Sequence, residues 1–252
     1  MKNINLYQYC LQLADTSFIL SHRIAEYCSK APHLEEDLAI TNVGLDLLGQ
    51  AESLLKYAAE IKNDGTTEDD LVFKRKENDF KSIHLSEIPN FDFAFILARQ
   101  FLMDVYNELL FTKLSESKDD TINGISKKSI KEIRYHFQRS KDWMIRLGQG
   151  TEESNQRIQH ALNELWMYTN ELFYDSDVET ELEKEGISVL SSSLENDWRK
   201  KTNQVIIEAG LVVPENQPHS MQYGKDGVHT EYLGYLLAEM QHLPLMYPDA
   251  KW

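Results

Sequence analysis

Residues that interrupt helices are scarce in this chain, and this scarcity constrains its fold more than any other feature. The 252 residues include six prolines and eleven glycines, most of them between segments with helical periodicity. Proline removes a backbone hydrogen-bond donor and glycine adds backbone freedom, so their absence from long periodic segments favours long helices. No segment of useful length alternates apolar and polar residues as a half-buried strand would. The sequence therefore predicts an all-α protein.

Apolar spacing and turn residues set the expected helix boundaries. The predicted helices cover about residues 6–27, 34–61, 91–114, 125–147, 151–173 and 192–210, with a last helix from about residue 226. Thr151 can cap the fifth of these, and Ser192 with Glu195 can form a capping box for the sixth. Residues 175–186 have the composition of an acidic connector. We expect one domain over residues 1–252, with a four-helix core at about 4–147 and additional outer helices at about 151–247.

Charge and apolar content exclude several classes of ligand. The chain has 26 Lys and Arg against 41 Asp and Glu, a net charge of −15, which would repel nucleic-acid phosphates and anionic lipid. Its start lacks an apolar signal region, and apolar runs such as residues 93–98 are far shorter than the roughly 20 residues needed to span a bilayer. Cys10 and Cys28 lie on one predicted helix, about 27 Å apart, too far to pair. We expect a cytoplasmic protein.

Charged residues recur on one face of each of the first four predicted helices. The faces are defined by spacings of three and four residues. The first helix carries Asp15 and His22 on this face, the second Asp46 and Gly49, the third Asp104, and the fourth Glu132, His136 and Arg139. Helices that are apolar on two sides are buried between neighbours, so we expect these faces to point into the bundle. In the second helix, Leu38, Leu45, Leu48 and Leu55 are expected to face the core.

This arrangement resembles a di-iron site without its nitrogen ligands. In ferritin-like di-iron bundles, two helices each supply one Glu and the other two each supply Glu-x-x-His. Here Asp46 is followed three residues later by Gly49, and Glu132 is followed by Tyr135, with His136 one position late. The carboxylates are present, and the expected imidazoles are missing from their usual positions.

Two interpretations of these residues remain open. Asp15, Asp46, Asp104 and Glu132 could bind metal, with His136 as a nitrogen ligand, because histidines and carboxylates four apart share a helix face. Alternatively, the cationic side chains His22, His136 and Arg139 could replace the metal charge, because buried carboxylates must be paired or hydrogen-bonded. The second interpretation predicts that Glu132 is paired with a neighbouring cation.

Segments spread over essentially the whole chain resemble the C-subunit family of ring 1,2-phenylacetyl-CoA epoxidase, a multicomponent bacterial monooxygenase of phenylacetate breakdown. The matching segments are 42–51 (Asn-Val-Gly-Leu-Asp-Leu-Leu-Gly-Gln-Ala), 131–136 (Lys-Glu-Ile-Arg-Tyr-His), 146–151 (Arg-Leu-Gly-Gln-Gly-Thr), 229–234 (His-Thr-Glu-Tyr-Leu-Gly) and 237–241 (Leu-Ala-Glu-Met-Gln). The resemblance implies a ferritin-like bundle that lacks iron and a structural, non-catalytic subunit.

The same resemblance implies partners and cofactors outside this chain. A homologous A subunit would hold the di-iron centre and activate O₂, and a reductase subunit would deliver electrons from NADPH through FAD and an iron–sulfur cluster. The product would be ring-1,2-epoxyphenylacetyl-CoA. By family position, the segments expected near phenylacetyl-CoA are Asp79, Phe80, Lys81 and Ser82, and Thr180, Glu181 and Leu182; Lys81 could meet a CoA phosphate. Two alternatives remain: a di-metal oxygenase in its own right, and a metal-free scaffold unrelated to oxygenation.

Overall fold

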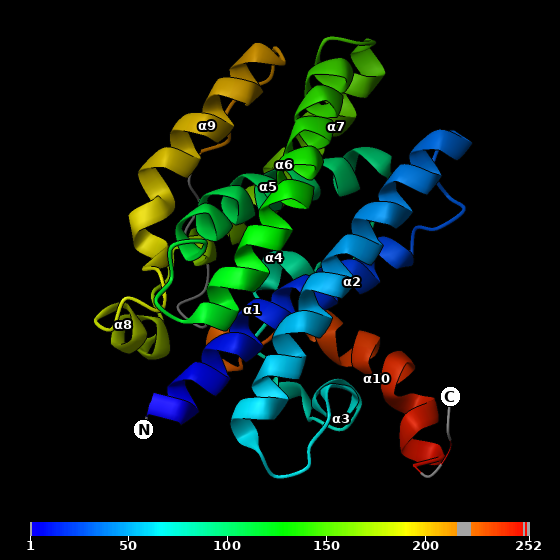
Figure 1. Cartoon of the computed structure of the whole chain (residues 1–252). Helices are drawn as coiled ribbons and strands as arrows, with labels where there is room; N and C mark the ends of the chain where they lie inside the picture. The colour runs from blue at the N-terminus through cyan, green and yellow to red at the C-terminus, as the bar shows by residue number, and fades with distance from the viewer. Residues whose placement is uncertain (1, 216–222, 249, 251–252) are drawn as a thin grey trace.

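The computed structural model describes residues 2–215, 223–248 and 250, and these residues form helices, turns and loops without a β-strand (Figure 1). Its four long helices are α1 (Lys2–Ala25), α2 (Leu34–Lys62), α5 (Phe93–Leu114) and α6 (Asp120–Gly148). α1 packs along α2, α5 packs along α6, and α2 also contacts α6. The predicted all-α bundle of long helices with additional outer helices is confirmed.

α5 is the central helix of the bundle. Its residues 94–107 are buried without interruption, so that every face of the helix lies against a neighbour. α6, in contrast, buries a single stripe that includes Ile122, Ile133 and Met144. The start of α5 is fixed by Asp92, whose side chain accepts a 2.8 Å hydrogen bond from the backbone N–H of Phe95. A polar side chain on α5 is therefore enclosed by protein rather than by water.

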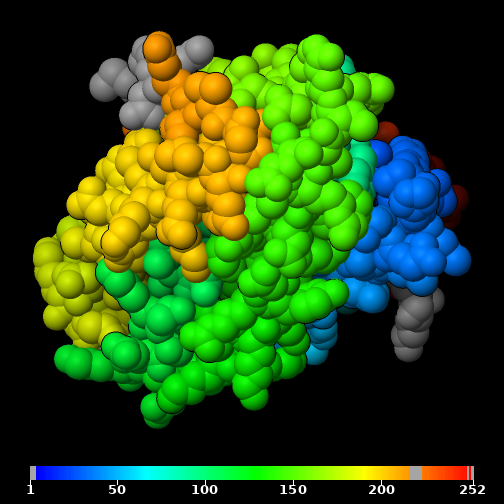
Figure 2. Space-filling view, turned by 90° about the horizontal axis from the view of Figure 1, so that it is seen from above, coloured from blue at the N-terminus to red at the C-terminus, as the bar shows by residue number. Residues whose placement is uncertain are grey.

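Shorter helices surround this core. They are α3 (Glu68–Phe73), η1 (Glu77–Asp79), α4 (His84–Glu87), α7 (Glu152–Trp166), η2 (Met167–Phe173), α8 (Asp177–Glu183), η3 (Ser191–Leu194), α9 (Glu195–Glu208), η4 (Gly224–Asp226) and α10 (Glu231–Met246). α7 packs on α5 and α6, and α9 lies against the same pair, as the orange and green surfaces of Figure 2 show. A Cβ on Gly148 would lie 2.3 Å from the carbonyl oxygen of Ala209, so glycine is needed for this close approach.

Local signals placed some outer boundaries correctly and missed others. Thr151 caps α7 as predicted, with its Oγ1 accepting from the Ser154 N–H at 3.1 Å. The Ser192 capping box is wrong, because Ser192 lies inside the η3 turn and α9 begins without a side-chain cap. The expected acidic connector contains α8, which Ser176 and Glu179 start with a capping box. The last helix begins at Glu231 rather than near 226, because η4 and a left-handed turn at Gly227 precede it.

The predicted core face of α2 is wrong. Leu38, Leu45 and Leu48 are 56%, 58% and 38% exposed, and only Leu55 of the expected stripe is buried. The face that packs against α1 instead consists of Ile40, Val43, Gly44, Leu47, Gln50, Ala51, Leu54, Leu55 and Ala58. Both faces are apolar, and periodicity alone does not tell which one is covered.

Candidate functional site

Asp15 pairs with Arg75, a cation outside the predicted site. The carboxylate of Asp15 is 1% exposed and meets both terminal nitrogens of Arg75, at 2.9 and 2.5 Å. It also accepts a 2.8 Å hydrogen bond from the Lys81 backbone N–H. The guanidinium of Arg75 lies 4.2 Å over the ring of Phe80. The lone pairs of Asp15 are thus taken by protein donors, and the prediction that it joins a four-carboxylate cluster has no support.

Asp104 is enclosed by neutral partners on α5 and α6. Its oxygens lie 2.6 Å from Gln100 Nε2 and 2.7 Å from Ser140 Oγ. Burial raises the pKa of Asp104 to about 8, well above the ordinary value of an aspartate. Ser140 Oγ also lies 3.2 Å from the Phe137 carbonyl, so the hydroxyl can donate there and accept a hydrogen bond from a protonated Asp104 carboxyl group. The raised pKa favours the protonated, hydrogen-bonded form of Asp104 at neutral pH, and this form is a poor metal ligand.

Asp46 and His136 form the α2–α6 contact in the predicted site. His136 Nε2 lies 2.9 Å from the Asp46 carboxylate, and the imidazole is almost fully buried. Burial lowers the pKa of His136, although the hydrogen bond and charge of Asp46 oppose this. Glu132 is half-buried, and burial together with the nearby Asp46 charge raises its pKa. Within the described part of the chain no ion pair joins Glu132 to a cation, although the charge of Lys128, one turn earlier on α6, acts to lower the pKa of Glu132. The pairing that the second interpretation predicts is therefore not seen as a direct contact.

The other two expected counter-cations form no ion pair with these carboxylates in the described part of the chain, although the charge of Arg139 acts to lower the pKa of Asp104. The Nδ1 atom of His22 lies 3.1 Å from the carbonyl oxygen of Phe18, and burial lowers its pKa. Arg139 pairs with Glu36 at the start of α2. The positions expected to hold metal-binding nitrogens also lie outside the bundle: Tyr135 is 60% exposed, and a Cβ on Gly49 would have no neighbour within 4 Å.

The described residues therefore do not fit a di-iron centre. Across residues 2–215, 223–248 and 250, no group of three or more His, Cys, Asp or Glu side chains is arranged to hold a metal ion. Of the predicted set, the structure brings together Asp46, Glu132 and His136. It separates them from Asp15, which is committed to Arg75, and from Asp104, which is committed to Gln100 and Ser140. Opposite charges and hydrogen bonds within the protein hold Asp15, Asp46 and Asp104.

The segments expected near the acyl-CoA contribute partly to the core. Phe80 and Ser82 are fully buried, and Leu182 is buried in α8. Thr180 and Glu181 are exposed on α8, where Glu181 pairs with Lys184 at 2.7 Å. Asp79 is exposed, whereas Lys81 is half-buried, so the surface that either segment offers to a ligand is small. Their binding role stays a prediction.

A buried histidine–carboxylate pair connects residues 223–248, here called the tail, to α4. Glu87 is fully buried and meets His229 Nδ1 at 2.7 Å, Ser82 Oγ at 2.9 Å, and the backbone and hydroxyl of Thr230 at 2.9 and 2.8 Å. His229 Nε2 lies 2.9 Å from the carbonyl oxygen of Phe80. Because both imidazole nitrogens face acceptors, both must carry protons. Burial alone would lower the pKa of His229, but the hydrogen bond and charge of Glu87 raise it above its ordinary value.

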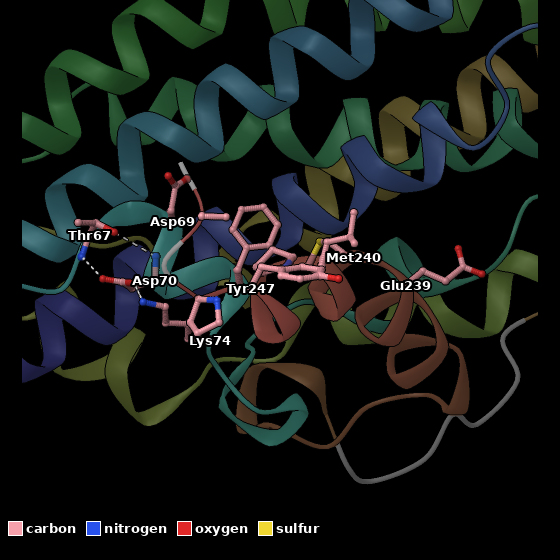
Figure 3. Close-up of a pocket in the computed structure, with 12 residues that line it drawn as sticks. Thr67, Asp69, Asp70, Lys74, Glu239, Met240 and Tyr247 are labelled. Atoms are coloured by element: carbon pink, nitrogen blue, oxygen red, sulfur yellow. Dashed lines mark hydrogen bonds and ion pairs between the residues drawn. The ribbon is translucent and has the colours of Figure 1, made fainter. Parts of the chain in front are cut away.

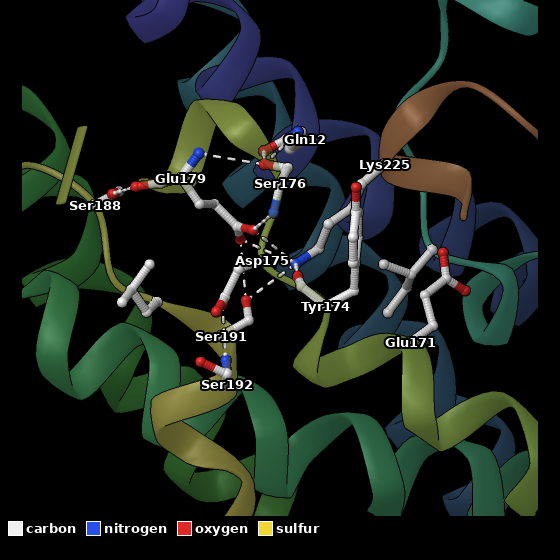
Figure 4. A network of polar contacts seen from close by, with 12 residues as sticks. Gln12, Glu171, Tyr174, Asp175, Ser176, Glu179, Ser188, Ser191, Ser192 and Lys225 are labelled. Atoms are coloured by element: carbon white, nitrogen blue, oxygen red, sulfur yellow. Dashed lines mark hydrogen bonds and ion pairs between the residues drawn. The ribbon is translucent and has the colours of Figure 1, made fainter. Parts of the chain in front are cut away.

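A buried lysine makes a second connection to the tail. Lys225 Nζ lies 2.9 and 3.1 Å from the two carboxylate oxygens of Glu179, and 2.8 and 3.0 Å from the Tyr174 carbonyl and Ser191 Oγ (Figure 4). Ser176 caps α8 in the same network. The partners of Lys225 come from separate stretches of the chain, so no local sequence motif predicts them. Lys225 lies among polar and apolar residues without helical periodicity, and this pattern does not predict that its side chain is buried.

Glu171 completes the buried polar layer under the tail. Its carboxylate accepts 2.7 Å hydrogen bonds from the backbone N–H groups of His84 and Gly224. Burial raises the pKa of Glu171 to about 7. A Cβ on Gly224 would lie 1.8 Å from the carbonyl oxygen of Ser82, so only glycine fits here. Glu87, Glu171 and Glu179 thus have structural partners, and the cavity that Glu179 and Lys225 line has a volume of only about 30 Å³.

A further cavity lies between α3 and α10 and is lined by none of these groups. It has a volume of about 590 Å³, with Phe73, Met240 and Tyr247 among its lining residues (Figure 3). Part of its polar edge is internally paired: Thr67 and Asp70 form the capping box of α3, and Asp70 meets Lys74 at 2.5 Å. The carboxylates of Asp69 and Glu239 also line the cavity.

Comparison with known proteins gives one consistent result. The family described as phenylacetic acid catabolic protein matches residues 1–252. The chain is 46% identical over 244 residues to the C subunit of 1,2-phenylacetyl-CoA epoxidase from Escherichia coli (strain K12), an alignment that covers 97% of this chain and 98% of that protein. In the described part of the chain, no helix is long and apolar enough to cross a membrane. The helical bundle and the full-length match together show that this chain belongs to the phenylacetic acid catabolic protein family.

Proposed function

We propose that this chain is the non-catalytic, metal-free subunit of a phenylacetyl-CoA 1,2-epoxidase. In this role it supports a homologous A-type subunit, which holds the di-iron centre and converts phenylacetyl-CoA and O₂ to the ring-1,2-epoxide with electrons from NADPH. The curated relative supports this assignment, because it is named as the C subunit of such an epoxidase. FAD and iron–sulfur groups belong to a reductase partner, and NADPH-dependent work of this kind suits the cytoplasm.

One observation carries the non-catalytic assignment. Three of the four carboxylates at the expected ligand positions are satisfied by protein: Asp15 by Arg75, Asp46 by His136, and Asp104 by Gln100 and Ser140. A di-iron site needs several ionised carboxylates and at least one imidazole free to coordinate. Metal binding here would first have to break a buried Asp–Arg pair and deprotonate Asp104. Both costs oppose metal loading.

Metal analysis of the purified chain tests this proposal directly. The chain is produced alone in iron-supplemented medium, and its iron is measured beside that of the A-type subunit from the same organism. We expect iron only in the A-type subunit. About two irons per chain, which is the content of a di-iron bundle, would overturn the proposal in favour of a di-metal oxygenase. If the co-produced A-type subunit never co-purifies with this chain, the unrelated scaffold is favoured instead.

The role of the predicted acyl-CoA segments belongs to the same proposal. Lys81 is half-buried beside Gly227, and within the described residues its ammonium has no ion-pair partner. A cation in that position can meet a CoA phosphate at the edge of a subunit interface. Lys81→Gln in the reconstituted complex should raise KM for phenylacetyl-CoA and leave kcat unchanged. An unchanged KM would remove Lys81 from the substrate contact.

A further inference from the structure

α2 is apolar on two opposite faces, and only one of them is covered. At about 100° per residue, the buried side chains from Ile40 to Leu54 centre on the side opposite Leu34, Leu38, Leu45 and Leu48. These four leucines, the α2 stripe, are 38–70% exposed and fall within a sector of roughly 80° over about 21 Å of helix. Helices that are apolar on two sides are normally packed on both.

The stripe has a concave apolar flank on the side of α1 and α3. Leu48 lines a cavity of about 420 Å³ together with Phe18, His22, Val72 and Phe73. This cavity is large enough to receive side chains from another protein. In Figure 2, the residues that lead into α2 form the blue lobe that projects beyond green α6, so the start of the stripe is accessible from outside.

The other flank of the stripe lies along the line where α2 meets α6, the α2–α6 seam, and it includes Gly49. A Cβ on Gly49 would meet no atom within 4 Å, so the backbone of α2 is open to close approach there. Across the seam, Tyr135 is 60% exposed and lines a groove of about 320 Å³ with Glu36 and Trp143. Exposed aromatic residues beside an apolar helix are enriched in protein–protein interfaces.

Charge distinguishes a foreign partner from a second copy. The first turn of α2 carries Glu35 and Asp37, and the far end of the stripe adjoins Glu52, Glu68 and Asp69. Lys56 offsets part of this charge by pairing with Glu52 and Glu68. Two copies related by a two-fold axis across antiparallel α2 helices would place these acidic ends against each other, at −15 net charge per chain. The surface instead suits an apolar helix bordered by Lys and Arg.

We propose that the α2 stripe, with Gly49 and Tyr135 beside it, is the surface on which the A-type subunit docks. The identity of this partner depends on the proposed function; the location of the surface depends on the exposed leucines and their charged borders. The partner contributes an apolar helix that crosses α2 near Leu45, with basic side chains directed at the carboxylates near Leu48.

Binding measurements on the full chain test the surface. The A-type subunit from the same organism is immobilised, and its Kd for each variant is measured by biolayer interferometry. The variant Leu38→Glu/Leu45→Glu should weaken binding by about a hundredfold or more, because charges replace apolar contacts at the centre of the interface. Gly49→Trp, which adds bulk where the fold has open space, should also weaken binding. Thermal unfolding of each variant confirms that the bundle is intact.

A matched control separates this surface from exposed apolar residues in general. Ile207 and Val212 are 66% and 72% exposed outside the α2 stripe, and Ile207→Glu/Val212→Glu should bind as the wild-type chain does. Equal binding by the stripe variant and the wild type would overturn the surface assignment alone. Absence of binding by the wild type would overturn the proposed function and the assignment with it. Dimers of the chain alone that Leu38→Glu/Leu45→Glu dissociates, in sedimentation equilibrium, would assign the stripe to a second copy.

Discussion

Replacing Asp104 by asparagine should stabilise this protein, and increasingly so as the pH rises. The pKa of Asp104 is raised by burial to about 8, against an ordinary value of 3.8. A raised folded-state pKa means that the native state holds the proton more tightly than the unfolded chain does. The contribution of Asp104 is therefore fully present below about pH 4 and is lost progressively as the pH rises towards 8.

The size of the effect follows from linkage. Each unit of pKa difference corresponds to about 1.4 kcal/mol, so between pH 6 and pH 8 the wild type should lose roughly 2 kcal/mol relative to Asp104→Asn. Asparagine keeps a hydrogen-bonding side chain, because its Oδ1 can accept from Gln100 Nε2 as the Asp104 oxygen does. Packing is nearly unchanged, because the two side chains have the same shape.

Urea unfolding of both proteins at pH 5, 6, 7 and 8 measures this difference directly. Every other titrating group is common to both proteins and cancels when the two free energies of unfolding are subtracted. The difference should grow with pH in favour of Asp104→Asn. Parallel pH profiles would refute the reasoning, because they would show that Asp104 is ionised in the native state. A destabilised variant at pH 8 would refute it equally.

Three further predictions concern the buried charges. Arg75→Met should lower the free energy of unfolding by roughly 3–5 kcal/mol, because it leaves the Asp15 carboxylate buried without its cation; Asp15→Asn in that background should restore most of the loss in urea unfolding, and strictly additive effects would argue against the pair. NMR titration of His229 should give a pKa above the ordinary 6.5. The stability that its pair with Glu87 contributes is then present below pH 6.5 and is lost as the pH rises through the pKa of the folded state. A measured pKa below 6.5 would contradict an imidazolium that donates from both nitrogens. Glu132→Ala should change the free energy of unfolding by less than about 1 kcal/mol, since Glu132 is half-buried and forms no ion pair among the described residues. A loss of about 3 kcal/mol or more in urea unfolding would instead indicate that Glu132 is part of a buried pair.

Local features of the chain were predicted well because they depend on neighbouring residues. The long helices follow from repeated three- and four-residue spacing, and Thr151 caps α7 through its own hydroxyl. The Ser192 cap failed because a 3₁₀ turn runs directly into α9, and a capping motif within a continuous helical stretch looks the same in sequence. A spacing of four residues predicts that Glu132 and His136 share one face of α6, but it does not name the neighbour; the structure shows that His136 meets Asp46 of α2.

The sequence by itself determined that the chain forms long helices and that acidic residues recur on them at helical spacing. Only the tertiary structure decided what those residues do, because helical periodicity defines faces but not which face is covered or by what. Asp15 is neutralised by Arg75, which lies 60 residues away, and no local pattern connects the two. The same ambiguity explains why the leucines of α2 that were expected in the core are exposed. Both faces of the helix are apolar, and α1 packs against the face that carries Val43 and Leu47. The leucines left outside are the ones that a partner can cover.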